Sequence, residues 1–155
     1  MILSNLIIKE NTPVHQGGGI YVNNNSNITL NNCIIKNNSI VEVNGAGMCL
    51  EGASVAELNN VIISDNYSEG TLEAYTPHGA GLMVGYNSQL FFNNSIIYNN
   101  NSQNQDVAGG IGVQSNGSVS VLNSIIRNNS SEAIGLDNSG ATIIAKRDGV
   151  VDKID

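Results

Sequence analysis

Charged side chains are scarce in this 155-residue chain, where they make up 12% of the residues and give a net charge of −7. The six Lys and Arg residues are scattered along the sequence. This argues against nucleic acid or an anionic membrane surface as partner, because both require clustered cations. Trp is absent and aromatic residues amount to 5%, so the chain is poor in side chains that stack on bases or sugars. No apolar run approaches the ~18 residues of a membrane span. We do not expect Met1-Ile2-Leu3 to begin a signal peptide, because no basic region and no long apolar run follow it.

Metal-binding patterns are also lacking. The two cysteines, Cys33 and Cys49, do not have the spacing of a metal site. The repeat described below turns Cys33 inward and Cys49 outward, so we do not expect a disulfide between them. The two histidines, His15 and His78, have no neighbouring Cys or paired acids, and we predict no metal site from them.

The chain does contain an internal repeat. The block Asn-x-Ile-Ile-x-x-Asn recurs at nearly regular intervals, the longest of which separates Asn60 from Asn94; its copies begin at Asn5, Asn32, Asn60, Asn94 and Asn123. A second block, two small residues followed by apolar residues, precedes the later copies and begins at Gly18, Ala46, Ala80 and Gly109. A degraded copy of it begins at Glu132. Such periodicity is typical of a solenoid.

The apolar runs are short, rich in Ile and Val, and alternate with a period of two, which is typical of strands. The chain lacks the fixed Leu pattern of leucine-rich repeats and the six-residue period of a left-handed β-helix. We therefore predict one all-β domain, residues 1–155, folded as a single-stranded right-handed parallel β-helix of about five to six coils with three short strands each. The first full coil should bury Ile20, Val22, Ile28, Leu30, Cys33 and Ile35.

Asparagine has a structural role in this prediction. The turn between second and third strands needs a left-handed backbone, which Asn tolerates. Side-chain amides at this turn would also bond to the coils above and below. We predict such a turn ladder at Asn32, Asn60, Asn94 and Asn123.

The Gly-Gly-Gly-Ile-Tyr segment ending at Tyr21, combined with the Asn-x-x-Ile-x-x-Asn pattern, resembles right-handed parallel β-helix repeat proteins of bacterial surfaces. These include polymorphic outer-membrane proteins and secreted, cell-anchored repeat proteins. The resemblance runs from about Leu3 to Ile144. It implies an extracellular or cell-surface location and a chain that is part of a longer solenoid. The same superfold carries pectate lyases and other polysaccharide-cleaving enzymes.

Lyases of this fold bind substrate along the first strand and use acidic residues for Ca²⁺ with an Arg or Lys base. The outward first-strand column expected here contains none of these; it is formed by Tyr21, Cys49, Met83, Gly112 and Gly135. The next column has two acids, Glu51 and Asp137, three coils or ~14 Å apart, whereas paired catalytic carboxylates lie ~5–10 Å apart.

We therefore predict a structural or adhesive module without catalysis of its own, which displays variable loops to surface glycans or proteins. The alternative is that the chain is part of a carbohydrate-active β-helix, either a polysaccharide lyase or a glycosidase, whose catalytic coils lie outside these 155 residues. No cofactor is expected, unless loop acids bind Ca²⁺ weakly. The candidate residues for such a Ca²⁺ or ligand site are Glu69, Glu73, His78 and Asp106. We favour the simpler interpretation that they belong to solvated loops.

Two surfaces remain as candidates for association. The first isoleucine of each Ile-Ile pair should point outward and stack into an apolar ridge formed by Ile34, Ile62, Ile96 and Ile125, with Ile7 above them. Either a flanking segment covers this ridge, which we favour, or it docks a partner. The two ends of the solenoid should expose unpaired strand edges, so we also expect end-to-end self-association.

Overall fold

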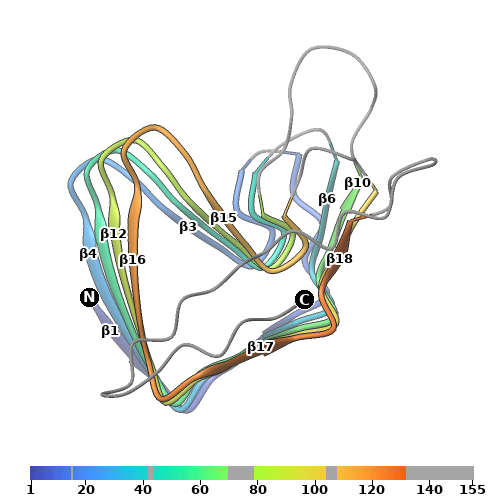
Figure 1. The fold of residues 1–155 in the computed structure, drawn as a ribbon, viewed down its shortest axis with the longest axis horizontal. Helices are drawn as coiled ribbons and strands as arrows, with labels where there is room; N and C mark the ends of the chain where they lie inside the picture. Colours follow the sequence, from blue (N-terminus) through green and yellow to red (C-terminus); the bar gives the residue numbers. More distant parts are fainter. Residues whose placement is uncertain (15, 42–43, 70–78, 104–107, 132–155) are drawn as a thin grey trace, which may run out of the picture.

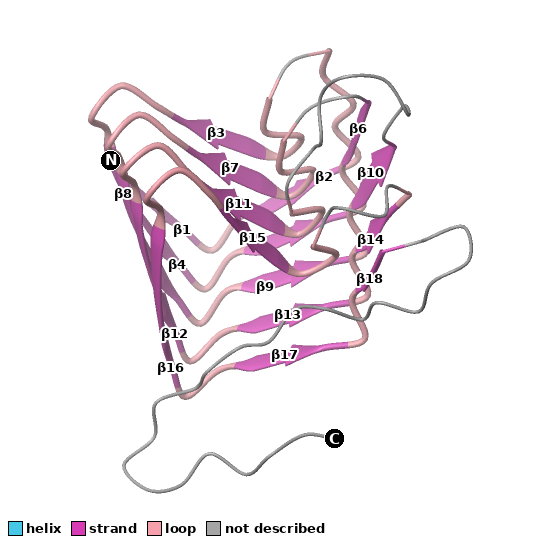
Figure 2. Cartoon of the chain, turned by 45° about the horizontal axis from the view of Figure 1, so that its top comes forward, coloured by secondary structure: helices cyan, strands magenta, loops and turns pink. Residues whose placement is uncertain are grey.

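A computed structural model describes residues 1–14, 16–41, 44–69, 79–103 and 108–131. These residues form eighteen strands that wind as a parallel solenoid (Figures 1 and 2). Four complete coils of four strands follow a half coil made of β1 (Ile2–Ser4) and β2 (Ile7–Lys9). The described segments include no helix that would be able to span a membrane.

The strands of the four complete coils repeat in one order. The first coil contains β3 (Ile20–Val22), β4 (Asn27–Asn31), β5 (Ile34–Lys36) and β6 (Ser39–Val41). The second contains β7 (Met48–Leu50), β8 (Val55–Asn59), β9 (Ile62–Ser64) and β10 (Tyr67–Glu69). The third contains β11 (Leu82–Val84), β12 (Gln89–Asn93), β13 (Ile96–Tyr98) and β14 (Asn101–Ser102). The fourth contains β15 (Ile111–Val113), β16 (Ser118–Leu122), β17 (Ile125–Arg127) and β18 (Ser130–Ser131).

Equivalent strands of successive coils pair in parallel and build four sheets. The first-strand sheet has the order β15-β11-β7-β3, and the second-strand sheet β1-β4-β8-β12-β16. The third-strand sheet has the order β17-β13-β9-β5-β2, and the fourth-strand sheet β18-β14-β10-β6. The predicted parallel solenoid is confirmed.

The number of strands per coil and the number of coils differ from the prediction. Each coil has a fourth strand that the sequence did not signal, because these segments, such as Ser130–Ser131, are very short and mostly polar. The described residues complete four coils, rather than five to six. The further coil expected from Glu132 onward lies outside the described residues.

The core is a set of apolar columns that run along the solenoid axis. Leu30 pairs in register with Leu58, and Phe92 lies between Leu58 and Val121. Of the residues predicted to be interior, Ile20 is partly buried against the core. The others are buried, namely Val22, Ile28, Leu30, Cys33 and Ile35. Because each inward side chain packs on its counterparts one coil away, burial by stacking is the main source of stability.

Coil length varies in one place only. The stretch from the start of the first strand to the start of the fourth strand has the same length in every complete coil: Ile20 to Ser39, Met48 to Tyr67, Leu82 to Asn101 and Ile111 to Ser130. The step from the start of the fourth strand to the next first strand differs instead, running from Ser39 to Met48, from Tyr67 to Leu82 and from Asn101 to Ile111. All length variation among these coils therefore enters at one corner.

A glycine closes each coil at this corner. A Cβ built on Gly81 would lie 2.6 Å from the Gly110 carbonyl oxygen and 3.0 Å from Asn100 Nδ2. The returning backbone thus passes directly over a buried asparagine amide, and there is no space for a side chain.

Candidate functional site

The predicted turn asparagines lie between the second-strand and third-strand sheets, directly after β4, β8, β12 and β16. All four have a left-handed backbone, with φ of 54°, 56°, 50° and 50°, and all are exposed. Asn60 Nδ2 donates to Asn32 Oδ1 at 2.7 Å, and Asn32 Nδ2 donates to Asn5 Oδ1 at 3.3 Å. The backbone requirement of the turn accounts for Asn at these positions, and water can also satisfy their exposed amides.

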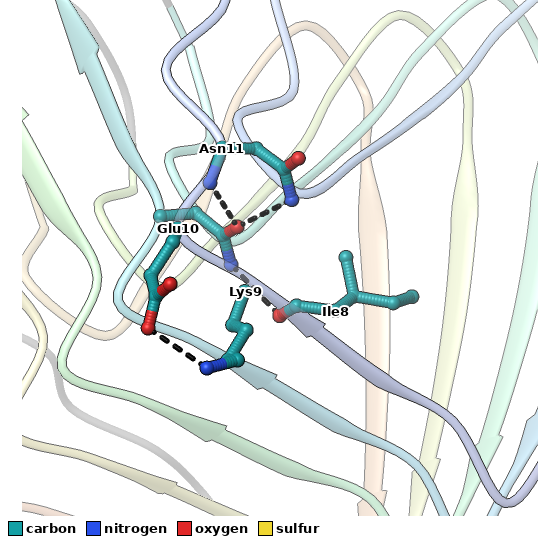
Figure 3. Close-up of polar contacts among 5 residues, drawn as sticks. Ile8, Lys9, Glu10 and Asn11 are labelled. Atoms are coloured by element: carbon teal, nitrogen blue, oxygen red, sulfur yellow. Dashed lines mark hydrogen bonds and ion pairs between the residues drawn. The ribbon is translucent and has the colours of Figure 1, made fainter.

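A second asparagine ladder is buried and was missed by the sequence argument. Its members follow the third strand of each coil, at Asn11, Asn38, Asn66, Asn100 and Asn129. Asn38, Asn66 and Asn100 are at most 1% exposed. From Asn11 to Asn100, each Nδ2 donates to the Oδ1 of the next asparagine, at 2.9, 2.9, 2.8 and 2.9 Å along the series. Figure 3 shows the first rung, where Asn11 donates from both its backbone nitrogen and its Nδ2.

The buried ladder also satisfies backbone groups. The second amide hydrogen of Asn38 is donated to the Ile8 carbonyl at 3.2 Å, and Asn66 does the same to Ile35. The sequence signal was the last Asn of the repeated block, present in every copy. Since it is not among the residues with positive φ, its side-chain amide, rather than its backbone, explains why Asn recurs there.

The apolar ridge lies on the outer face of the third-strand sheet. Ile7, Ile34, Ile62, Ile96 and Ile125 pair in register. The three middle residues are half-buried, while Ile7 and Ile125 at the two ends are 60% and 53% exposed. The five isoleucines therefore form a stacked row, and whether a partner docks on it stays a prediction.

A column of polar and cationic side chains runs beside the ridge. In register it contains Lys9, Lys36, Ser64, Tyr98 and Arg127. The Arg127 guanidinium lies 5.9 Å from the Tyr98 ring centroid, within cation–π range. Every Lys and Arg of the described ranges is in this column, although the sequence made the basic residues look scattered.

A polar cluster lies on the outer face of the first-strand sheet. Tyr21, Cys49, Met83 and Gly112 pair in register, as the alternation predicted. However, Cys49 and Met83 are fully buried rather than exposed to solvent. In Figure 1 the first strands start near the corner at which the fourth strands lie and run away from it. Gln16, from the segment that leads into β3, reaches over this face to Glu51.

The centre of this cluster is Glu51, which is only 5% exposed. The Tyr21 hydroxyl donates to Glu51 Oε2 at 3.0 Å. With the Gln16 amide nitrogen turned towards the carboxylate, it donates to both oxygens, at 2.8 and 2.6 Å. Neutral donors therefore stabilise this buried carboxylate, and the structure gives it no ion pair with any described cation.

Two neighbours of Glu51 have raised pKa values. Burial, followed by the hydrogen bond to Glu51 and its charge, raises the pKa of Tyr21 to about 12. Burial and the Glu51 carboxylate also raise the pKa of the Cys49 thiol. At neutral pH Cys49 therefore stays a protonated thiol and is a poor nucleophile. Both cysteines are free.

The proposed loop site is mostly outside the described residues. Glu69 is exposed at the end of β10, while Glu73, His78 and Asp106 lie in segments that the structure does not describe. Within the described ranges, no group of three or more His, Cys, Asp or Glu side chains is arranged to hold a metal ion.

Comparison with known proteins gives one family. The family model described as the right handed beta helix region matches residues 2–151. Neither the curated proteins nor the solved structures include a significant match.

Proposed function

The chain belongs to the right-handed β-helix family, and from that premise we propose that it is a secreted or surface-exposed display module. The stacked coils are the rigid part, and the connections from each fourth strand to the next first strand form the binding surface. The partners would be surface glycans or proteins. In this proposal the coils themselves have no catalytic role.

The observation that carries the proposal is the confinement of length variation to one corner. The part of each coil from the first strand to the fourth is constant in length, whereas the connecting step varies and is longest between Tyr67 and Leu82. Loops of variable length on a rigid scaffold are a common basis for binding. All of them start from the fourth-strand sheet, in which β6, β10, β14 and β18 are neighbours.

The polar cluster does not favour a catalytic alternative. Glu51 is the only carboxylate of the described part in its column, which continues through Asn23, Gly85 and Gln114. It is buried and bound by neutral donors. A glycosidase needs a second carboxylate within ~10 Å, and a lyase needs an accessible base.

The test is a loop exchange. Residues 70–78 would be replaced by Ser-Gly, which shortens the longest connection, and the labelled protein would be applied to arrays of neutral and acidic glycans and to immobilised collagen and fibronectin. We expect binding by the natural chain and at least a tenfold loss for the exchange, with an unchanged melting temperature. The matched control is Ala53→Asn with Tyr86→Asn, at left-handed turn positions on the corner of constant length, which should bind normally.

Three results would contradict the proposal. The first is binding that survives the loop exchange, and the second is binding that the control variant abolishes. The third is release of unsaturated or reducing-end sugars from polygalacturonate or alginate by the purified protein, with or without Ca²⁺, because that would make the chain an enzyme.

A further inference from the structure

The cationic side chains of the described residues lie on one face of the solenoid. Lys9, Lys36 and Arg127 all belong to the outward column of the third-strand sheet, next to the apolar ridge. The acids of the described ranges are instead found beside all four sheets, at Glu10, Glu51, Glu57, Asp65 and Glu69. Within the described part, the third-strand face is therefore the only one that has Lys or Arg side chains.

Carboxylates neutralise only part of this charge. Two acids follow third strands: Glu10 pairs with Lys9 at 2.9 Å, and Asp65 accepts a hydrogen bond from Asn99 at 3.4 Å. The pair of Lys9 with Glu10 is the only ion pair between described residues. Lys36 and Arg127 therefore have no carboxylate partner in the described part of the chain, and this face can attract an anionic partner.

The apolar ridge and the cationic column run in parallel. Figure 2 shows β9, β13 and β17 stacked one above another, so that each outward position continues along the solenoid axis. Ridge and column positions are two residues apart in each strand, or about 7 Å. The ridge isoleucines of the middle coils, Ile34, Ile62 and Ile96, are half-buried. The face thus offers an apolar row beside a row of hydrogen-bond donors, because every Lys, Ser, Tyr and Arg of the column has an N–H or O–H group.

The geometry of the face favours a helix as the element that binds it. An added strand needs a sheet edge, whereas β5, β9 and β13 are paired on both sides. A sugar ring would need a free aromatic face, but Tyr98, the aromatic residue of the column, already lies against Arg127. An amphipathic helix binds through side chains alone.

The dimensions agree with a helix that lies along the solenoid axis. The sheet has five strands, so the ridge spans four steps of ~4.8 Å, or ~19 Å. A helix of about 13 residues has this length, and its pitch of ~5.4 Å places about one turn over each coil. The described part of this chain contains strands and no helix, so a second copy does not supply one from these residues.

We propose that the third-strand face docks an acidic, amphipathic α-helix of a partner protein. The apolar stripe of the helix packs on the ridge, and carboxylates along one flank pair with Lys36 and Arg127. This surface is separate from the connections between fourth and first strands, so the proposal does not rest on the display function.

The test uses two synthetic, fluorescently labelled helices of about 15 residues. The acidic peptide has leucine along one stripe and glutamate on both flanks, and the matched basic peptide has lysine in place of every glutamate. Binding to the full chain is measured by fluorescence anisotropy. We expect the acidic peptide to bind at least tenfold more tightly than the basic one, with an affinity that falls as salt is added.

Two variants test the two rows separately. Ile62→Ser removes the centre of the ridge, and Lys36→Glu reverses a charge of the column; each should weaken binding of the acidic peptide at least fivefold. The matched control is Phe91→Ser, which removes a large apolar side chain, 41% exposed, from the outer face of the second-strand sheet. It should bind like the natural chain, as should the exchange of residues 70–78. Circular dichroism melts would verify that each variant is folded.

The proposal is overturned if the acidic peptide does not bind, if the basic peptide binds equally well, or if Phe91→Ser weakens binding as much as Ile62→Ser does. Two other occupants would also overturn it. Polygalacturonate would be the occupant if it bound the natural chain and lost that binding in Lys36→Glu while the peptide did not. A second copy would be the occupant if ultracentrifugation showed a dimer that Ile62→Ser converts to a monomer.

Discussion

Removal of one rung of the buried ladder measures how much the solenoid depends on it. In Asn66→Ala, the backbone N–H and one amide N–H of Asn38 lose their acceptor, Asn66 Oδ1, at 3.0 and 2.9 Å. The Ile35 carbonyl and Asn100 Oδ1 lose the donor Asn66 Nδ2. Asn38 is 0% exposed, so water cannot replace these bonds without opening the coil.

The expected cost follows from the two buried donors left unsatisfied, at about 1–3 kcal/mol each. We therefore expect Asn66→Ala to lower the free energy of unfolding by about 3–5 kcal/mol, a large part of the ~5–15 kcal/mol that stabilises a typical domain. Chemical denaturation, followed by circular dichroism, is the measurement.

The turn asparagine Asn60 is the matched comparison. Asn60→Ala loses one exposed hydrogen bond and places Ala at φ 56°, which together should cost about 1–2 kcal/mol. Asn60→Gly tolerates this φ and should cost less than about 1 kcal/mol. If Asn66→Ala were no more destabilising than Asn60→Ala, the buried ladder would not be the stronger of the two.

Three further predictions concern the closing corner, the two cysteines and the polar cluster. Gly81→Ala should lower the melting temperature clearly, since its Cβ would lie 2.6 Å from the Gly110 carbonyl oxygen; an unchanged melt would mean that the corner relaxes freely. Thiol reagents at neutral pH should leave the buried Cys33 and Cys49 unmodified until denaturant is added, and rapid labelling of the folded protein would contradict the burial described. Phenolate absorbance should show Tyr21 ionising near pH 12. Because this pKa is raised from an unfolded value of about 10, the contribution of Tyr21 to stability is complete below pH ~10 and is lost as the pH rises to ~12. Glu51→Gln should bring the Tyr21 pKa back towards 10, and an unchanged titration would exclude the carboxylate as a cause.

The repeat allowed most of the fold to be predicted from the sequence. Alternation with a period of two determines which side of a strand is apolar, and it correctly places Leu30 and Ile35 in the core and Ile34 on the outer face. The left-handed backbone at Asn32 follows from its residue type, since few other side chains tolerate that backbone.

Other features were decided by tertiary contacts. The fourth strand of the second coil, Tyr67–Glu69, is short and mostly polar, and it is a strand because the neighbouring coils supply its pairing partners. Asn66 is buried because the backbone of Gly47 passes over its amide, whereas Asn60 stays exposed. The number of residues between a fourth strand and the next first strand varies from coil to coil, so the sequence pattern does not indicate which turn is covered.

The polar cluster shows the same division between sequence and tertiary structure. The sequence by itself determined that Tyr21 and Cys49 share an outward column. Only the tertiary structure decided that this column is sheltered and that Glu51, which directly follows β7, is bound by Gln16 from a different segment. The physical reason is that side-chain direction is a local property of a strand, whereas burial depends on which other segment lies over that face.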